Sequence, residues 1–471
     1  MNVLLINPPA LHEIKGPHPF RSDDMGVFPH LGLMYIAAVL QQDDVFEVKL
    51  IDMALEKLEL FDLLQIYDKF RPQVIGLTSY TDCLYDLKLL IHALRSFSHK
   101  TFICAGGAHV EAYSKEMLTA FPVDCIIRGD GEYAFRELCR RLRDGKNWHD
   151  VRGIGYKDGL SMHLNEPWQV EDLDKLPFPK RTLSSMHKVT SAVVGDSSIT
   201  SICSSRGCPF PCTFCNSPYK NYRLRSPENV TSEIEQCYLE YGIDTFFFFD
   251  DLFNLDKQRL LEMCAAIRCL PFRIKWSFRG RINAVDEHVL RACKDAGCNR
   301  IHFGVEAGTE RILKIYKKGV TLSEIRKVFT LCRKVGIETV GNFMFGAPGE
   351  TLAEMKETIN FAYSLKPSFV EFHVLVPYPY TEIYKNMLQS GLVKEDVWLQ
   401  FALDPQPEFV PPLCEEYVPS ENMYSLLNQA YRGFYLRPSY IIQHLSKLSS
   451  LKDLLLKAKG AYRLHVVTAG K

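Results

Sequence analysis

Short apolar runs alternate with amphipathic stretches over the first 145 or so residues of the chain. Each run has the length of a buried strand, and a helix-like pattern follows it. Strand then helix, five times over, predicts an α/β domain with a doubly wound, flavodoxin-like parallel sheet. The predicted strands are residues 3–6, 45–51, 74–79, 101–104 and 125–127. The predicted helices are residues 31–41, 58–70, 84–97, 114–121 and 132–142.

The alternation resumes at residue 199 with longer helices. Six strand–helix repeats predict a partial (β/α)6 barrel of the TIM type, two repeats short of a closed barrel. Its strands are expected at residues 199–203, 245–249, 272–278, 300–305, 338–345 and 369–376. Its helices are expected at residues 227–241, 256–269, 286–296, 310–316, 322–335 and 351–365.

Four segments follow from these patterns. A hairpin pattern around Gly159 and a proline-rich stretch separate the two alternating regions, and the part beyond the last repeat has a mainly helical pattern. The clearest helices of this tail are residues 422–435 and 440–459. We therefore expect a sheet domain, a linker, a barrel and a helical C-terminal region at residues 1–145, 146–190, 191–380 and 381–471.

Composition narrows the class of protein. Hydrophobic residues make up 46% and charged residues 24% of the chain, which is ordinary for a globular protein. The 56 Lys and Arg residues balance 56 Asp and Glu residues, so a nucleic-acid binder is not expected. The basic run formed by Lys314, Lys317 and Lys318 is expected to be a solvated helix face.

The N-terminal pattern is that of a buried strand, so we expect no secretory leader, and no apolar run of the roughly 18–20 residues that span a bilayer occurs in the sequence. The 15 cysteines therefore indicate a reducing, cytoplasmic setting and thiol or metal chemistry instead of disulfides.

The strongest chemical signal is a cysteine triplet. Cys208, Cys212 and Cys215 lie on a Gly- and Pro-rich loop directly after the first predicted barrel strand. Three thiolates at this spacing can hold a [4Fe-4S] cluster and leave one iron without a protein ligand. That iron can chelate the amino and carboxylate groups of a sulfonium substrate, as an open site serves a catalytic metal. An electron from the cluster would then break the C–S bond and release a carbon radical.

Two alternatives compete with the cluster. The triplet and a distant fourth ligand could hold a structural zinc ion, or the thiols could simply fill the core. The other twelve cysteines, such as Cys264 and Cys293, lie in apolar helical patterns and are expected to be core residues.

The predicted first sheet should bind a ligand at the carboxyl ends of its strands. Glycine, proline and polar residues stand at those ends, namely Pro8, Ser79, Gly106, Gly107, Gly129, Gly131 and Glu132. Taken alone, they indicate only that some ligand binds there.

With these motifs in their order, the sequence resembles the cobalamin-binding branch of the radical S-adenosylmethionine (radical SAM) superfamily. It is most similar to the group that includes anaerobic magnesium-protoporphyrin monomethyl ester cyclase and several carbon methyltransferases. The resemblance runs from the N-terminus to about residue 440 and implies an enzyme with three cofactors, a [4Fe-4S] cluster, S-adenosylmethionine (SAM) and cobalamin.

The resemblance also implies SAM contacts after successive barrel strands. Phe214 would lie against the adenine, and Asp250 and Asp251 would lie near the amino group. Arg281 would meet the carboxylate or ribose, and Glu306 would accept hydrogen bonds. The stretch that begins at Gly346 would approach the adenine. Acids and an arginine do complement the charges of SAM, but helix capping or structural ion pairs would also explain the acids.

For the first domain, the resemblance implies cobalamin at the strand ends already named and at the loop that contains Gly32. The Asp-x-His-x-x-Gly signature that supplies a histidine to cobalt elsewhere is missing, so the lower cobalt face would lack a histidine ligand. His30 and His109 are expected to be exposed or hydrogen-bonded loop residues.

The implied reaction is methylation of an unactivated carbon in a natural product, lipid or tetrapyrrole. The 5′-deoxyadenosyl radical would abstract hydrogen from the substrate, and a flavodoxin or ferredoxin would supply electrons. Oxidative cyclisation or rearrangement with the same cofactors, and a non-catalytic cobalamin or redox sensor, are the alternatives.

Overall fold

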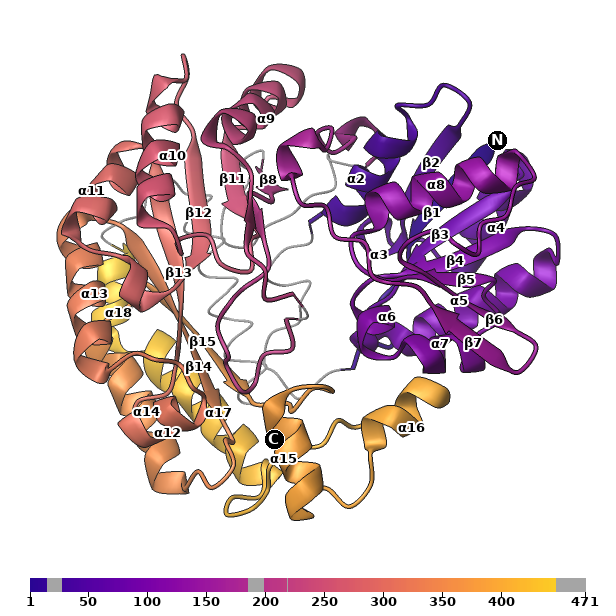
Figure 1. The fold of residues 1–471 in the computed structure, drawn as a ribbon. Coiled ribbons are helices and arrows are strands. Elements are labelled where there is room, and N and C mark those ends of the chain that lie inside the picture. The colour runs from indigo at the N-terminus through magenta and orange to yellow at the C-terminus, as the bar shows by residue number, and fades with distance from the viewer. Residues whose placement is uncertain (15–27, 185–198, 218, 446–471) are drawn as a thin grey trace. The chain divides into compact units, whose positions relative to one another are not determined.

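The computed structural model describes residues 1–14, 28–184, 199–217 and 219–445 (Figure 1). These residues divide into two compact units. The first unit takes residues up to 184 together with 395–411, and the second takes 199–394 and 412–445.

The first unit is built on a seven-stranded sheet in the order β2-β1-β3-β4-β5-β6-β7. The first five strands are parallel, and their 2-1-3-4-5 order is that of flavodoxin, as the sequence predicts. They are β1 (Asn2–Asn7), β2 (Glu47–Asp52), β3 (Val74–Thr78), β4 (Phe102–Gly106) and β5 (Cys125–Ile127). The helices are α2 (Leu31–Leu40), α3 (Met53–Glu56), α4 (Leu60–Phe70), α5 (Leu84–Phe97), α6 (Ala108–Ala112), α7 (Ser114–Ala120) and α8 (Gly131–Arg143).

The segment assigned to a linker contributes to this sheet. Strands β6 (Ile154–Asp158) and β7 (Ser161–Leu164) form the expected hairpin around Gly159. However, β6 also pairs antiparallel with β5, so the hairpin extends the sheet. The half-polar pattern of these strands gave no sign of a sheet partner.

The second unit contains six parallel strands in the order β15-β14-β13-β12-β11-β8. The sheet does not close, which confirms the partial barrel. Its strands are β8 (Ile199–Ile202), β11 (Thr245–Phe248), β12 (Lys275–Gly280), β13 (Cys298–Glu306), β14 (Glu338–Phe345) and β15 (Phe369–Val374). Its helices are α9 (Pro227–Tyr241), α10 (Lys257–Cys269), α11 (Glu287–Asp295), α12 (Glu310–Ile315), α13 (Leu322–Val335) and α14 (Leu352–Leu365).

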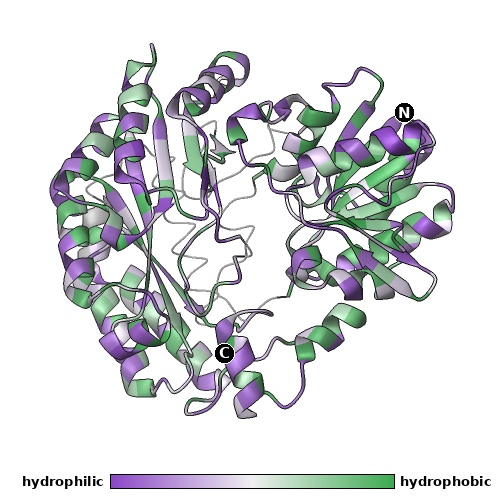
Figure 2. Cartoon of the chain, in the orientation of Figure 1, coloured by the Kyte–Doolittle hydropathy of each residue, from purple (hydrophilic) through white to green (hydrophobic). Residues whose placement is uncertain are grey.

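Aromatic side chains fill the layer between this sheet and its helices. Phe248, Trp276 and Phe278 are completely buried. The Trp276 ring lies 5.6 Å from Phe248 on the neighbouring strand and 5.7 Å from Phe278 on its own strand. Figure 2 shows the matching pattern of hydrophobic strands and helices that are hydrophilic along their outer faces. The burial of such large rings is what makes short parallel strands stable here.

The helical C-terminal region is shared between the two units. Helix α15 (Glu382–Ser390) and α17 (Ser420–Tyr435) belong to the second unit, and the Tyr431 hydroxyl of α17 bonds the backbone of Phe372 in β15. Helix α16 (Val397–Leu403) belongs to the first unit and packs on α7. The predicted helix 440–459 starts within α18 (Pro438–Leu445), and residues 446–459 lie outside the described part.

No helix in the described ranges has the length and apolar character that a membrane crossing requires.

Candidate functional site

The cysteine triplet lies on a loop that is held at both ends. Strand β9 (Ser205–Arg206) pairs with β10 (Arg223–Leu224), so the intervening residues form a closed loop beyond β8. Gly207 begins the loop at φ 86°, and a Cβ there would lie 2.2 Å from the Asn221 carbonyl oxygen. Only glycine allows this approach, which explains the Gly in the motif. We call residues 207–222 the cluster loop.

The centre of the cluster loop is anchored to the barrel. The Thr213 amide donates to the Tyr316 carbonyl at 3.2 Å, and its hydroxyl donates to the Ile315 carbonyl at 3.0 Å. The Ile383 amide in turn donates to the Thr213 carbonyl at 3.0 Å. Thr213 stands between the second and third cysteines, so these bonds set where both thiols lie.

The three cysteines of the triplet are free thiols on one short loop, which is the donor type that iron–sulfur clusters use. Cys208, Cys212 and Cys215 are all free, and the Cys215 backbone amide donates a hydrogen bond to the Cys212 carbonyl at 3.1 Å. The surrounding loop desolvates the Cys215 thiol and raises its pKa, and the neighbouring Cys212 and Cys208 add to the increase. A cation would reverse this effect. No set of three His, Cys, Asp or Glu side chains converges on a single-ion site within the described ranges.

Arg281 lies beside the second cysteine. Its Nη1 is 3.6 Å from Cys212 Sγ, and its guanidinium carbon is 3.6 Å from the centre of the Phe210 ring. Its Nη2 donates to the backbone carbonyl of Lys318. The side chain is therefore fixed on three sides, although it carries no carboxylate partner in the described residues. A fixed arginine without a carboxylate is suited to an anionic ligand group.

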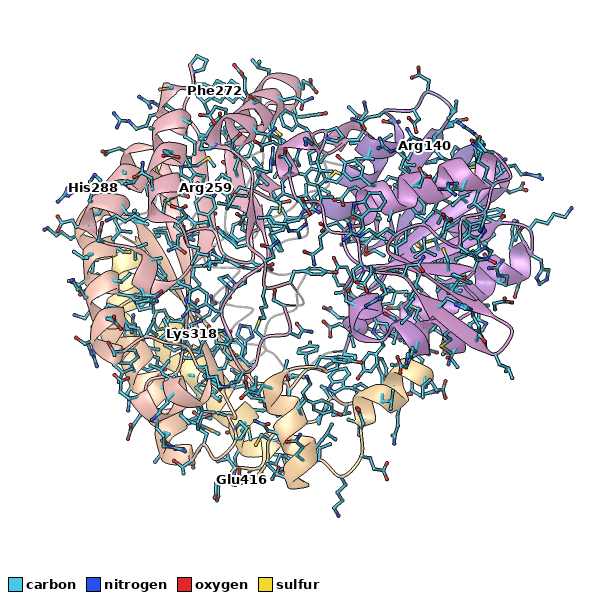
Figure 3. All side chains as sticks on the ribbon, viewed as in Figure 1. Arg140, Arg259, Phe272, His288, Lys318 and Glu416 are labelled. Carbon is cyan, nitrogen blue, oxygen red and sulfur yellow. The ribbon has the colours of Figure 1, made fainter. Side chains whose placement is uncertain are left out.

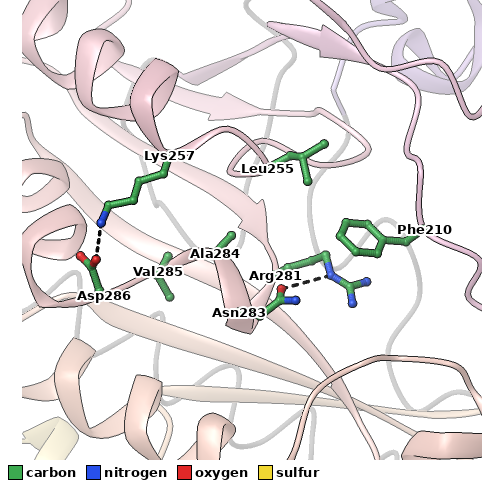
Figure 4. A pocket seen from close by; sticks show the side chains of 8 residues that line it. All are labelled: Phe210, Leu255, Lys257, Arg281, Asn283, Ala284, Val285 and Asp286. Atoms are coloured by element: carbon green, nitrogen blue, oxygen red, sulfur yellow. Dashed lines mark hydrogen bonds and ion pairs between the residues drawn. The ribbon is translucent and has the colours of Figure 1, made fainter.

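A pocket of about 370 Å³ opens next to Arg281. Figure 4 shows the Arg281 guanidinium between the Phe210 ring and Asn283 at one end, and the Lys257–Asp286 ion pair at the other. The lining residues are Phe210, Leu255, Lys257, Arg281, Asn283, Ala284, Val285 and Asp286.

The two acids after β11 differ in role. Asp250 is buried, and it accepts bonds from the Ser204 amide at 2.7 Å and from the Ser204 and Ser205 hydroxyls at 2.6 and 2.7 Å. Burial raises its pKa even though these bonds oppose the shift. Asp250 thus ties the end of β8 to the end of β11. Asp251 is exposed and accepts from the Gly207 amide at 3.1 Å, which leaves most of its capacity open.

Glu306 ends β13 in an unusual conformation. Its φ is 71°, a left-handed value that is uncommon for a residue with a side chain, and the register with β14 shifts between Gly304 and Glu306. Its Oε1 accepts from Lys318 Nζ at 2.7 Å, and both side chains are only 9% exposed. Strain of this kind concentrates at functional sites.

The buried Lys318 corrects the sequence analysis, which placed it on a solvated face (Figure 3). Its Nζ lies 5.8 Å from the centre of the Phe214 ring, and that ring lies edge-on to Tyr316 at 5.2 Å. The short segment from Ile315 to Lys318 therefore contacts the cluster loop, Arg281 and Glu306 together. The signal that could have revealed Lys318 is its position, because Gly319 follows it and ends the helical pattern of the other two lysines.

The turn after β14 is organised by Glu350. Gly346 has φ 92°, and its amide and that of Ala347 donate to Glu350 Oε2 at 2.7 and 2.9 Å. Burial raises the pKa of Glu350 to about 7. Its Oε1 is buried without a hydrogen-bond partner in the described residues. Helix α17 covers the turn, since a Cβ on Gly346 would lie 3.1 Å from Met423 Sδ.

The carboxyl edge of the first sheet relies on backbone contacts. Both the amide and the hydroxyl of Ser79 donate to the Gly106 carbonyl at 2.7 Å. Gly107 has φ 104°, and a Cβ there would lie 2.8 Å from the Ser79 carbonyl oxygen. The loops after β3 and β4 thus lie against each other through glycine.

His109 differs from its expected loop position. It lies in α6, is fully buried, and its Nδ1 is 3.0 Å from Thr81 Oγ1. Burial lowers its pKa to about 3, so the ring is neutral, and its Nε2 has no partner in the described residues. His30 caps α2 through its Nδ1, and its Nε2 lies 3.0 Å from the Tyr80 hydroxyl.

The remaining predicted positions pack mostly against protein. Gly129 has φ 89°, and a Cβ there would lie 2.2 Å from the Trp168 carbonyl oxygen. Gly131 begins α8 against Ile36, and Glu132 is buried within that helix. Pro8 follows β1 and is buried, whereas Gly32 is exposed in the first turn of α2.

Comparisons with known proteins agree with this architecture. Residues 202–362 match the Radical SAM superfamily, and residues 24–139 match the B12 binding domain. The chain is 31% identical to the uncharacterized methyltransferase PH0819 of Pyrococcus horikoshii over 94% of this chain and 95% of that protein. It is 23% identical to the anaerobic magnesium-protoporphyrin IX monomethyl ester cyclase of Cereibacter sphaeroides, over 79% of this chain and 62% of that protein.

Among solved structures, the radical SAM methyltransferase TsrM of Kitasatospora setae, with cobalamin and a [4Fe-4S] cluster bound, has the same fold. Its TM-score is 0.71 at 18% identity, over 93% of this chain and 89% of that chain. These matches confirm the expected fold class, cofactor set and enzyme class. The chain belongs to the radical SAM superfamily, in the group of cobalamin-dependent, methyltransferase-like enzymes that join a B12-binding domain to the radical SAM domain.

Proposed function

We propose that this enzyme methylates an unactivated carbon of a small-molecule substrate. The observation that carries the proposal is the anchored cluster loop beside Arg281 and the Glu306–Lys318 pair, in one chain with a flavodoxin-like sheet. When bound, the cluster supplies the electron that cleaves SAM and the cobalamin supplies the methyl group. PH0819 and TsrM, both named as methyltransferases, support this reaction over others.

The side chains of the barrel edge would divide the parts of SAM among them. Arg281 would bind the carboxylate, and the exposed Asp251 and the fixed Glu306 would accept bonds from the amino and ribose groups. The edge of Phe214 and the glycine turn at Gly346 would receive the adenine, since glycine lets a backbone approach a flat ring. The role of Asp250 would be to position the loop, because its oxygens are already used.

The first unit would hold cobalamin against Ser79, Gly106 and Gly107 at the switch point of its sheet. The buried, neutral His109 would support this edge from the protein interior through its contact with Thr81. All 15 cysteines are free thiols, which supports a reducing, cytoplasmic setting in which a flavodoxin or ferredoxin could deliver electrons. A natural product, lipid or tetrapyrrole is the expected substrate.

The second candidate is oxidative cyclisation or rearrangement with the same cofactors. The similarity to the Cereibacter sphaeroides cyclase favours it. A cobalamin or redox sensor would not require the open, oriented side chains of Arg281 and Asp251, so we rank it below both reactions.

The products separate these candidates. The reconstituted protein is incubated without oxygen with a low-potential reductant, cobalamin, methyl-labelled SAM and a metabolite extract. Methylation yields S-adenosylhomocysteine beside 5′-deoxyadenosine and moves the label into a new product. Cyclisation yields 5′-deoxyadenosine alone, and a sensor yields neither nucleoside. The absence of S-adenosylhomocysteine would therefore overturn the methylation proposal.

A further inference from the structure

The two faces of the barrel sheet differ in what covers them. Phe303 and Phe372 are completely buried and pack on helices, with their rings 5.6 Å from Phe329 of α13 and Tyr431 of α17. Side chains alternate along a strand, so the residues between these positions point away from the helices, toward the inside of the barrel.

Four polar side chains follow one another across the inner face, one on each of four strands. Arg279 of β12 is the register partner of His302 of β13, and Asn342 of β14 is the register partner of Glu371 of β15. Gly304, which is two residues beyond His302, is paired with Asn342, so the two pairs are neighbours. We call Arg279, His302, Asn342 and Glu371 the polar row.

No side chain of the polar row has a hydrogen bond or ion pair within the described residues, although the carboxylates of Glu371 and Asp251 act on Arg279 at longer range. The Arg279 guanidinium contacts only rings, at 4.7 Å from the centre of Phe249 and 5.7 Å from that of Phe247. The Asn342 side-chain oxygen is buried without a partner. Buried polar groups are normally satisfied, so the Asn342 oxygen is an exception. Arg279 is exposed and His302 and Glu371 are half-buried, so their hydrogen-bonding groups are open to a ligand.

Arg300 is an arginine on the same face whose charge is paired within the protein. It precedes His302 by two residues and therefore shares its face. Its Nη2 lies 2.7 Å from Glu338 Oε2, and its guanidinium lies 4.6 Å from the centre of the Phe369 ring. The inner face thus has a satisfied arginine near the start of its strands and an unsatisfied one near their carboxyl ends.

We propose that the polar row binds the substrate, with a carboxylate or phosphate at Arg279 and hydroxyl or amide groups at His302, Asn342 and Glu371. This inference rests on the proposed function, and it narrows the substrate to a polar, anionic compound. A hydrocarbon would strip water from all four side chains and return no hydrogen bond. Phe247 and Phe249 flank Arg279 and would pack against a planar or apolar part next to the anionic group.

Calorimetric titration of the reconstituted full chain tests the row with three small probes. Phenyl phosphate and benzoate carry the two candidate anions, and benzyl alcohol is neutral. We expect at least one of the two anions to bind. Arg279→Gln should weaken that binding at least tenfold, and Arg279→Lys should retain part of it. The stronger of the two anions identifies the substrate group as phosphate or carboxylate.

A gain of binding protects the test against misfolding. Glu371 lies near enough to Arg279 to interact with it electrostatically. Glu371→Gln therefore removes the repulsion between the Glu371 carboxylate and an anion bound at Arg279, and it should tighten anion binding severalfold. The surface variant Arg291→Gln, which loses one arginine from the outside of the same barrel, should bind as the wild type does. Iron content and the cluster spectrum of each variant report whether the barrel is intact.

Two results would overturn the inference. Binding of the anions that is equal in Arg279→Gln and wild type would remove the row as their site, and preferred binding of benzyl alcohol would exclude a polar substrate. Either result leaves the proposed function standing if the wild type still forms 5′-deoxyadenosine and S-adenosylhomocysteine. Failure to form these nucleosides would reject the proposed function instead, whatever the probes do.

Discussion

Both sheets of the chain present the carboxyl ends of parallel strands, but the barrel edge and the loops after β3 and β4 differ in chemistry. The barrel edge carries charged groups, among them Arg281, Asp251 and the buried Glu306–Lys318 pair. Where β3 and β4 of the first sheet end, Ser79 bonds to the Gly106 backbone, Gly107 lies against Ser79, and the buried His109 is neutral. The contrast indicates that charge selects a small zwitterionic ligand at the barrel, whereas close backbone approach shapes a surface at the first sheet.

The largest expected effect comes from the three thiols. Alanine at Cys208, Cys212 and Cys215 together should abolish cluster iron and 5′-deoxyadenosine formation, because no other described group of ligands replaces them. Cobalamin content of the purified protein should not change, since the other sheet is untouched. Elemental analysis and product chromatography measure both effects.

A matched control keeps this test specific. Cys269 is an exposed thiol at the end of α10, and Cys269→Ala should retain full iron content. Normal iron content and normal 5′-deoxyadenosine formation in the triple variant would refute the assignment of the cluster to these three thiols. Loss of cobalamin in the same variant would instead show that the two edges depend on each other.

The buried pair at the barrel edge gives the next largest effect. Lys318→Met leaves the Glu306 carboxylate buried without its cation, which costs about 3–5 kcal/mol of stability. Lys317→Met is the control, because the Lys317–Glu382 pair is exposed and contributes about 0–1 kcal/mol. Denaturant unfolding measures both losses. The change in the cluster's electron paramagnetic resonance spectrum when SAM is added shows whether Glu306 is also displaced, and equal losses in the two variants would contradict a special role for Lys318.

The corresponding weak point of the first sheet is a glycine. Gly129→Ala places a Cβ 2.2 Å from the Trp168 carbonyl in a left-handed conformation, so a backbone segment must shift. Gly145→Ala is also left-handed, but nothing lies within 4 Å of its Cβ, and it should lose only about 1–2 kcal/mol. We expect Gly129→Ala to lose more stability and cobalamin than Gly145→Ala and to keep its iron. Equal effects would show that close approach is not the reason for the glycine.

The sequence predicted the fold because two periodicities repeat along it. Buried apolar runs and amphipathic helices of constant order define a parallel sheet whatever the details of packing. The sequence analysis placed the hairpin of β6 and β7 outside the sheet. Lys157 and Asp158 of β6 are exposed, and such a half-polar pattern does not indicate which strand pairs with it. Pairing between distant segments is a tertiary property that a local pattern does not contain.

The candidate site was predictable where chemistry is local and unpredictable where it is not. Three cysteines at this spacing on one loop are recognisable from the sequence alone. The need for Gly207 is also local, because the loop turns sharply just before the first cysteine. The difference between Asp250 and Asp251 depends on the Ser204 and Ser205 donors more than forty positions away. In the same way, the burial of Lys318 and the unpartnered Arg279 emerge only when strands far apart in the sequence come together.

At neutral pH the smallest effect concerns the neutral histidine of the first sheet, whose contribution changes only in acid. Burial lowers the pKa of His109 to about 3 from the usual 6.5, so the unfolded chain binds a proton between these values and the folded chain does not. Stability from this group is therefore complete above pH 6.5 and decreases as the pH falls toward 3, by up to about 1.4 kcal/mol per pH unit. Imidazole signals in a magnetic-resonance titration, assigned with His109→Gln, should show one ring that stays neutral at pH 4.5. A His109 that titrates near pH 6.5 would mean that this edge tolerates charge, and the contrast between the two sheets would then be lost.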